Sequence, residues 1–144
     1  MPAPLLALTD IHIAFGPKAL LAGADLEIGA GERICLVGRN GSGKSTLLRV
    51  AAGDIEADSG ERVTQTGTTI RYLPQEPDLS GFATVLDYAS ADLGPHGDDH
   101  RPRLLLEALG LKGNEQPEHL SGGEIRRAAI ARTLAPEPDI LLLD

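Results

Sequence analysis

The sequence predicts an α/β domain built around a mostly parallel sheet, and two observations carry this prediction. Compact apolar stretches such as residues 32–38 and 139–144 are typical of buried strands. Stretches with helical periodicity alternate with them along the chain, as in βαβ units. The 144 residues are enough to bury one core and too few for two, so residues 1–144 are expected to form one domain.

In the first half of the chain, residues 5–16 and 24–29 alternate apolar and polar positions, which predicts two strands of a small antiparallel sheet. Residues 32–38 predict a buried strand that leads into a glycine-rich loop. A helix is expected over residues 44–53, with Gly53 as its stop.

In the second half, the β-branched and aromatic residues 67–75 predict a strand that breaks at Pro74. Residues 83–94 and 100–110 are helical in pattern and each ends in glycine. Residues 121–135 predict a third helix. The unbroken apolar run before Asp144 predicts a second buried strand.

Composition and charge narrow the classes of function. A net charge of −8 argues against this segment alone wrapping DNA or RNA, so any nucleic-acid partner would need surface from elsewhere. No apolar run approaches the roughly 20 residues of a membrane-spanning helix, and the first ten residues do not resemble a signal peptide, so a cytoplasmic location without membrane insertion is expected. The single cysteine, Cys35, excludes an internal disulfide and is expected to be a buried strand thiol.

The stretch "GRNGSGKS", residues 38–45, satisfies every position of the phosphate-loop pattern and follows a predicted strand and precedes a predicted helix. Its glycines let backbone N–H groups surround phosphate oxygens at a helix N-terminus. Lys44 would reach the β and γ phosphates, and Ser45 would bind Mg²⁺. The predicted nucleotide-binding residues here are Gly38, Asn40, Gly41, Ser42, Gly43, Lys44, Ser45 and Thr46.

A second glycine-containing motif, "LSGGE", lies at the start of the third helix. Ser121 with the N–H groups of Gly122 and Gly123 could bind an anion there. The alternative is an ordinary helix cap in which Glu124 assists Ser121.

The order of phosphate loop, glutamine strand, "LSGGE" helix and "ILLLD" strand resembles the ATP-binding cassette (ABC) ATPases from Phe15 to Asp144. The resemblance implies a P-loop NTPase fold of ABC type, with an antiparallel β subdomain and a helical signature subdomain over residues 77–134. It also implies binding of ATP with Mg²⁺.

The resemblance assigns three further residues. Phe15 matches the aromatic that stacks on adenine, although it could be a core residue of the first sheet. Gln75 matches the glutamine that reaches Mg²⁺ and the attacking water, and the alternative is a plain strand-end glutamine. Asp144 matches the Walker B aspartate, which binds Mg²⁺, unless it is simply solvated. On this basis Lys44, Gln75 and Asp144 are the expected catalytic residues, and Ser45, Gln75 and Asp144 the expected metal ligands.

In such ATPases the "LSGGE" element covers the γ phosphate held by the phosphate loop of a second cassette, so the resemblance implies a second cassette as partner, in the same chain or in a dimer. Binding and hydrolysis then become a closing and opening motion.

The family places a glutamate directly after the Walker B aspartate and a histidine later, and neither has a position in this sequence. We therefore expect an incomplete cassette that does not hydrolyse ATP alone, with hydrolysis in a longer parent protein. A strand between the phosphate-loop strand and the Walker B strand would also be missing, which would leave apolar strands unpaired.

Within the superfamily, the stretches around Gln75 and "LSGGE" look most like the first cassette of the ABC-F class, in particular its Uup-like members. The alternative is the ATP-binding subunit of a membrane transporter, which would act on a separate permease. A third possibility is an inert truncation.

Two other clusters are not credited with chemistry. His96, Asp98, Asp99 and His100 are expected to form a solvated loop rather than a metal site. Arg126 and Arg127 are expected to pair with nearby carboxylates.

Overall fold

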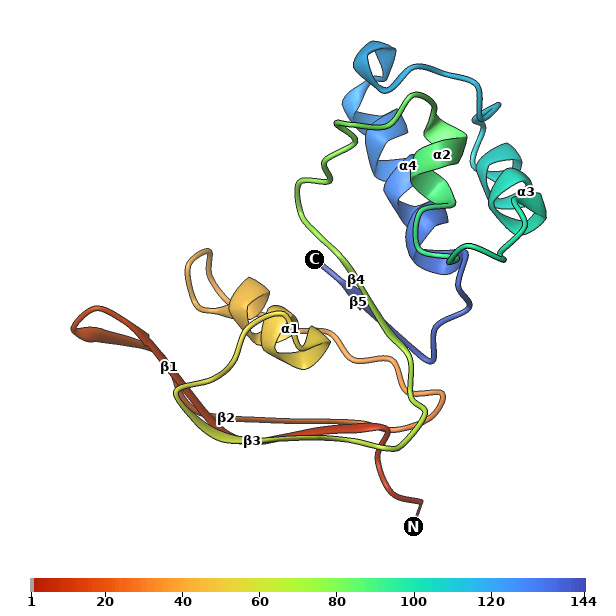
Figure 1. Cartoon of the computed structure of the whole chain (residues 1–144). Helices are drawn as coiled ribbons and strands as arrows, with labels where there is room; N and C mark the ends of the chain where they lie inside the picture. The colour runs from red at the N-terminus through yellow and green to blue at the C-terminus, as the bar shows by residue number, and fades with distance from the viewer. Residues whose placement is uncertain (1) are drawn as a thin grey trace. The chain divides into compact units, whose positions relative to one another are not determined.

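The computed structural model describes residues 2–144, which divide into two compact units. Unit 1 runs to Tyr72 and also includes Asp144, and unit 2 is Leu73–Leu143. The elements of each unit are labelled in Figure 1.

Unit 1 contains an antiparallel sheet of three strands, β1 (Leu6–Phe15), β2 (Lys18–Ile28) and β3 (Ser59–Thr64), in the order β2-β1-β3. The antiparallel pair expected from residues 5–16 and 24–29 is therefore confirmed, although β2 begins at Lys18, earlier than predicted. β3 was not predicted, because its side chains are exposed or only half-buried and it carries no apolar alternation.

The inward face of β1 changes parity halfway along the strand. Leu6 and Leu8 are fully buried, and so are Ile11 and Ile13 at 1% and 3% exposure. An uninterrupted strand would turn these two pairs to opposite faces. The register shift between Leu8 and Ile11, with Asp10 at φ 52°, adds the extra residue that returns both pairs to the core.

The helix predicted after the glycine loop is α1 (Lys44–Ala52), and Gly53 ends it at φ 86° as expected. Leu48, Val50 and Ala51 form its buried face.

The buried strand predicted over residues 32–38 is wrong. The segment is assigned to no strand, Val37 is 94% exposed, and Cys35 is exposed rather than buried. An apolar stretch becomes a strand only when a neighbouring strand pairs with its N–H and C=O groups. Within the described residues no strand pairs with this segment.

Unit 2 contains three helices that pack around one apolar cluster: α2 (Val85–Ala89), α3 (His100–Ala108) and α4 (Gly122–Leu134). They are drawn together in Figure 1. A short 3₁₀ helix, η1 (Pro117–His119), precedes α4. The helix predicted over residues 83–94 is much shorter than expected. It begins after the Thr84 cap and ends at Ala89.

The remaining strands, β4 (Ile70–Leu73) and β5 (Ile140–Leu143), form a two-stranded sheet. Both were predicted as strands, from residues 67–75 and from the apolar run before Asp144. β5 is not buried throughout: Ile140 and Leu142 are buried, whereas Leu141 and Leu143 are 39% and 61% exposed. No helix in the described part of the chain is long and apolar enough to cross a membrane.

Candidate nucleotide-binding site

The phosphate loop lies in unit 1, directly before α1, and two of its positions favour glycine by their backbone conformation. Gly41 and Gly43 have φ of +80° and +99°, which side chains rarely tolerate. A Cβ on Gly43 would also lie 2.9 Å from Leu21 Cδ2, and one on Gly38 would lie 2.7 Å from Ser42 Oγ. The loop can therefore pass close to β2 and turn tightly into the helix.

The Lys44 side chain makes hydrogen bonds to the backbone of this loop. Its Nζ donates to the carbonyl oxygen of Gly38 and, at 3.0 Å, to that of Arg39. The N-terminus of α1 begins at the same residue, and Gly43 provides no side-chain cap for its N–H groups. A cation and a helix N-terminus thus occur together, which is the combination that binds phosphate.

The Asp144 carboxylate accepts hydrogen bonds from both Ser45 and Tyr72. All three residues belong to unit 1. The Ser45 hydroxyl donates to Asp144 Oδ1 at 3.0 Å, although 99 positions separate the two residues. The Tyr72 hydroxyl donates to Asp144 Oδ2 at 2.6 Å. Asp144 is therefore not simply solvated.

Burial raises the pKa of Tyr72 to about 12, and the hydrogen bond to Asp144 adds to the rise. Tyr72 therefore keeps its proton at neutral pH and acts as a donor to the carboxylate. No sequence motif gave Tyr72 a role. The only local sign was its place on the strand that leads to Gln75.

The pair of Ser45 and Asp144 fits a magnesium ion by its donor chemistry. A hydroxyl and a carboxylate are hard oxygen ligands, which Mg²⁺ prefers. The described residues contain no group of three or more His, Cys, Asp or Glu side chains that could hold a metal. Two protein oxygens suit Mg²⁺, because this ion usually keeps several waters and also binds substrate phosphates.

Phe15 ends β1 and is 65% exposed, so the alternative that it is a core residue of the sheet is wrong. Gly16 follows it at φ +72° and turns the chain towards β2. The ring is thus free to meet a flat ligand.

The "LSGGE" motif forms a capping box at the start of α4. Ser121 Oγ accepts from the Glu124 N–H at 3.2 Å, and Glu124 Oε1 accepts from the Ser121 N–H at 3.0 Å. That backbone hydrogen bond from Ser121 lowers the pKa of Glu124. Gly122 and Gly123 are exposed, with open space where a Cβ would lie. The motif therefore does cap the helix, and this cap leaves the backbone of both glycines accessible.

Gln75 lies in unit 2, is exposed, and follows β4. Its carbonyl oxygen accepts from Arg126 Nη1 at 3.2 Å, and that of Pro74 accepts from the same atom at 2.9 Å. Arg127 donates to the carbonyl oxygens of Gly123 and Leu109. After the hydrogen bonds from Ser121, its charge also helps to lower the pKa of Glu124.

The polar loop before α3 uses its acidic groups locally. Asp98 Oδ1 accepts from the His100 N–H at 3.0 Å, and Asp99 pairs with Arg103 at 2.8 Å.

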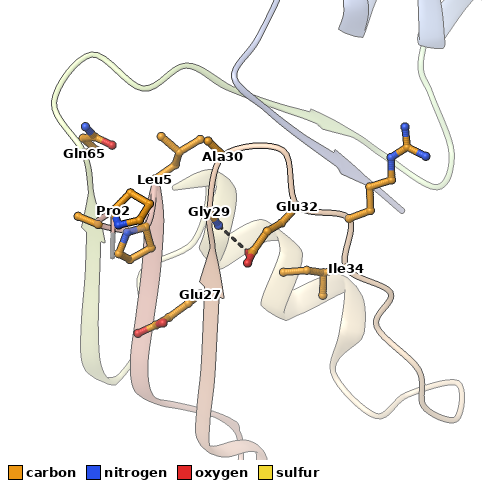
Figure 2. Close-up of a pocket in the computed structure, with 11 residues that line it drawn as sticks. Pro2, Leu5, Glu27, Gly29, Ala30, Glu32, Ile34 and Gln65 are labelled. Atoms are coloured by element: carbon orange, nitrogen blue, oxygen red, sulfur yellow. Dashed lines mark hydrogen bonds between the residues drawn. The ribbon is translucent and has the colours of Figure 1, made fainter.

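Unit 1 also contains a hollow that none of the predicted nucleotide residues lines. Figure 2 shows it between the ends of the strands and residues 29–34, with Glu32 Oε2 accepting from the Gly29 N–H at 2.8 Å. Its charged lining residues are Glu27, Glu32 and Arg33.

Known proteins resemble this chain over nearly its whole length. The family model described as ABC transporter matches residues 21–144. The chain is 50% identical, over 143 residues, to the ATP-binding protein Uup of Caulobacter vibrioides, which covers 99% of the chain and 23% of that protein. It is 39% identical to the aliphatic sulfonates import ATP-binding protein SsuB 2 of Mesorhizobium japonicum, covering 99% of the chain and 58% of that protein.

A solved ATP-binding cassette of an ABC transporter superposes with a TM-score of 0.77 at 23% identity, covering 97% of this chain and 68% of that one. The chain spans about a quarter of the Uup protein and less than two thirds of the SsuB protein. The family match covers most of the chain, and the superposition independently shows the same fold. The chain therefore belongs to the ABC transporter family and has the fold of an ABC ATPase.

Proposed function

We propose that the chain binds ATP together with Mg²⁺ as one cassette of a two-cassette ATPase. The observation that carries this proposal is the bond between Ser45 and Asp144 beside a phosphate loop that holds the Lys44 ammonium. Ser45 and Asp144, 99 positions apart, thus supply two hard oxygen ligands beside a cation and a helix N-terminus.

Each residue would contribute one interaction. The backbone N–H groups of residues 38–45 would surround the phosphates, and Lys44 would leave the loop carbonyls for the β and γ phosphates. Ser45 and Asp144 would hold Mg²⁺, which when bound neutralises charge on the phosphates. Phe15 would stack on adenine. We propose Gln75 as the further metal and water contact.

Hydrolysis would require a second cassette. Ser121, Gly122 and Gly123 would cover the γ phosphate bound to that partner, because their exposed backbone lies at the positive end of α4. The ATP would then lie between two cassettes, and its binding would close them.

We propose that the parent protein is a cytoplasmic ABC-F ATPase linked to translation or nucleic-acid processes. The 50% identity with a Uup protein, against 39% with a sulfonate import subunit, favours this class. The alternative is the ATP-binding subunit of a transporter. Co-sedimentation of an ATP-locked parent protein with ribosomes would support the first, and co-purification with a membrane permease would support the second.

Lys44→Ala tests the nucleotide site itself. We expect the affinity for ATP to fall at least about tenfold, because one charge-assisted contact to phosphate is worth roughly 1.5–3 kcal/mol. Lys112→Ala is the matched control, since Lys112 is an exposed lysine of unit 2. Equal ATP affinity of the two variants in calorimetry would contradict the proposal.

A further inference from the structure

Asp144 receives a separate donor on each of its carboxylate oxygens. Oδ1 accepts from Ser45, the proposed metal ligand, and Oδ2 accepts from the Tyr72 hydroxyl at 2.6 Å. Tyr72 lies on β4, whereas Asp144 directly follows β5, so the bond joins the ends of two elements. It is the shorter of the two bonds.

We propose that Tyr72 is a positioning residue that fixes the Asp144 carboxylate for the divalent cation beside the nucleotide. This inference rests on the proposed function. A carboxylate turns easily about its last side-chain torsion, which has a broad two-fold profile. A donor fixed to Oδ2 sets the plane of the group and leaves Oδ1 on the side of Ser45.

The chemistry of a tyrosine suits this position. A phenol is an uncharged donor, so it orients the carboxylate without cancelling the negative charge that attracts the cation. Its ring has only two side-chain torsions, and the strand backbone holds it. Partners that orient a metal ligand in this way are worth about 10–100-fold in metal affinity in known metal sites.

The test is Tyr72→Phe, which removes the hydroxyl and keeps the ring. We expect the Mn²⁺ affinity of the ATP-bound protein, measured by electron paramagnetic resonance, to fall about tenfold. The ATP affinity measured in EDTA should stay unchanged, because the phosphate loop is untouched. A merely structural role for Tyr72 would move both values together.

Tyr88→Phe is the matched control, because Tyr88 is a tyrosine of unit 2 that is packed in its core cluster. Its Mn²⁺ affinity should equal that of the unchanged protein. Unchanged or tighter Mn²⁺ binding by Tyr72→Phe would overturn the inference alone. Failure of the unchanged protein to bind ATP in EDTA would overturn the proposed function and the inference with it.

Discussion

Phe15 is the residue whose exposure most directly suggests a ligand contact. It is one of two phenylalanines in the sequence, and its ring is 65% exposed at the end of β1. We expect Phe15→Ala to weaken ATP binding by about 1–3 kcal/mol, the usual contribution of base–aromatic stacking. The fold should tolerate the change, since little buried surface is lost.

Tripolyphosphate provides the control for this prediction, because it lacks the base. Phe15→Ala should bind tripolyphosphate as the unchanged protein does, and Phe15→Trp should retain ATP binding. An equal loss for both ligands in calorimetry would show that Phe15 shapes the phosphate loop instead of contacting adenine.

At the same scale, the sequence predicted contacts within a motif better than contacts between distant residues. The spacing of residues 38–45 indicated a phosphate loop because each role there depends on local backbone and an adjacent side chain. The hydrogen bond from Tyr72 to Asp144 joins residues 72 positions apart, so no local sequence pattern predicts it.

At the scale of elements, the start of α4 combines a helix cap with a proposed phosphate contact. Ser121 caps the helix through its side chain, and the same residue is proposed to face the γ phosphate of a partner cassette. The two functions use different properties, since capping needs an acceptor oxygen and phosphate binding needs the absence of negative charge.

Ser121→Asp separates these functions. Aspartate caps a helix about as well as serine, so we expect the melting temperature to be retained. Its charge would repel the γ phosphate, so hydrolysis by the paired cassettes should fall at least about tenfold. Ser121→Ala is the complementary control, with a cost of about 0.5–2 kcal/mol in stability from the lost cap. Full ATP turnover by Ser121→Asp would contradict the proposed phosphate contact.

Among the elements, those with a local cause were predicted correctly. α1 has its glycine stop, α4 its capping box, and β1 its alternation of apolar and polar residues. β3 and the length of α2 were not, because both depend on packing partners elsewhere in the chain.

At the scale of the whole molecule, residues 32–38 show the limit of reading strands from composition. Their apolar run indicated a buried strand, but burial requires a partner strand and a covering layer. Within the part of the chain that the structure describes, neither forms there, and Ile34 and Val37 remain 47% and 94% exposed. The family and fold were still predicted, because the motif order does not depend on this strand.

Residues 32–38 are an exposed apolar stretch with which, within the described residues, no strand pairs. Such a stretch is a template for strand pairing, so we predict that the 144-residue chain self-associates. The net charge of −8 opposes association, so we expect it to grow with salt in sedimentation velocity. Val37→Lys should shift the protein towards monomer. Leu104→Lys makes the same change in net charge at a 53% exposed position on α3, where the helix satisfies its own backbone, and should associate as before. If both lysine variants were equally monomeric, net charge rather than residues 32–38 would control association.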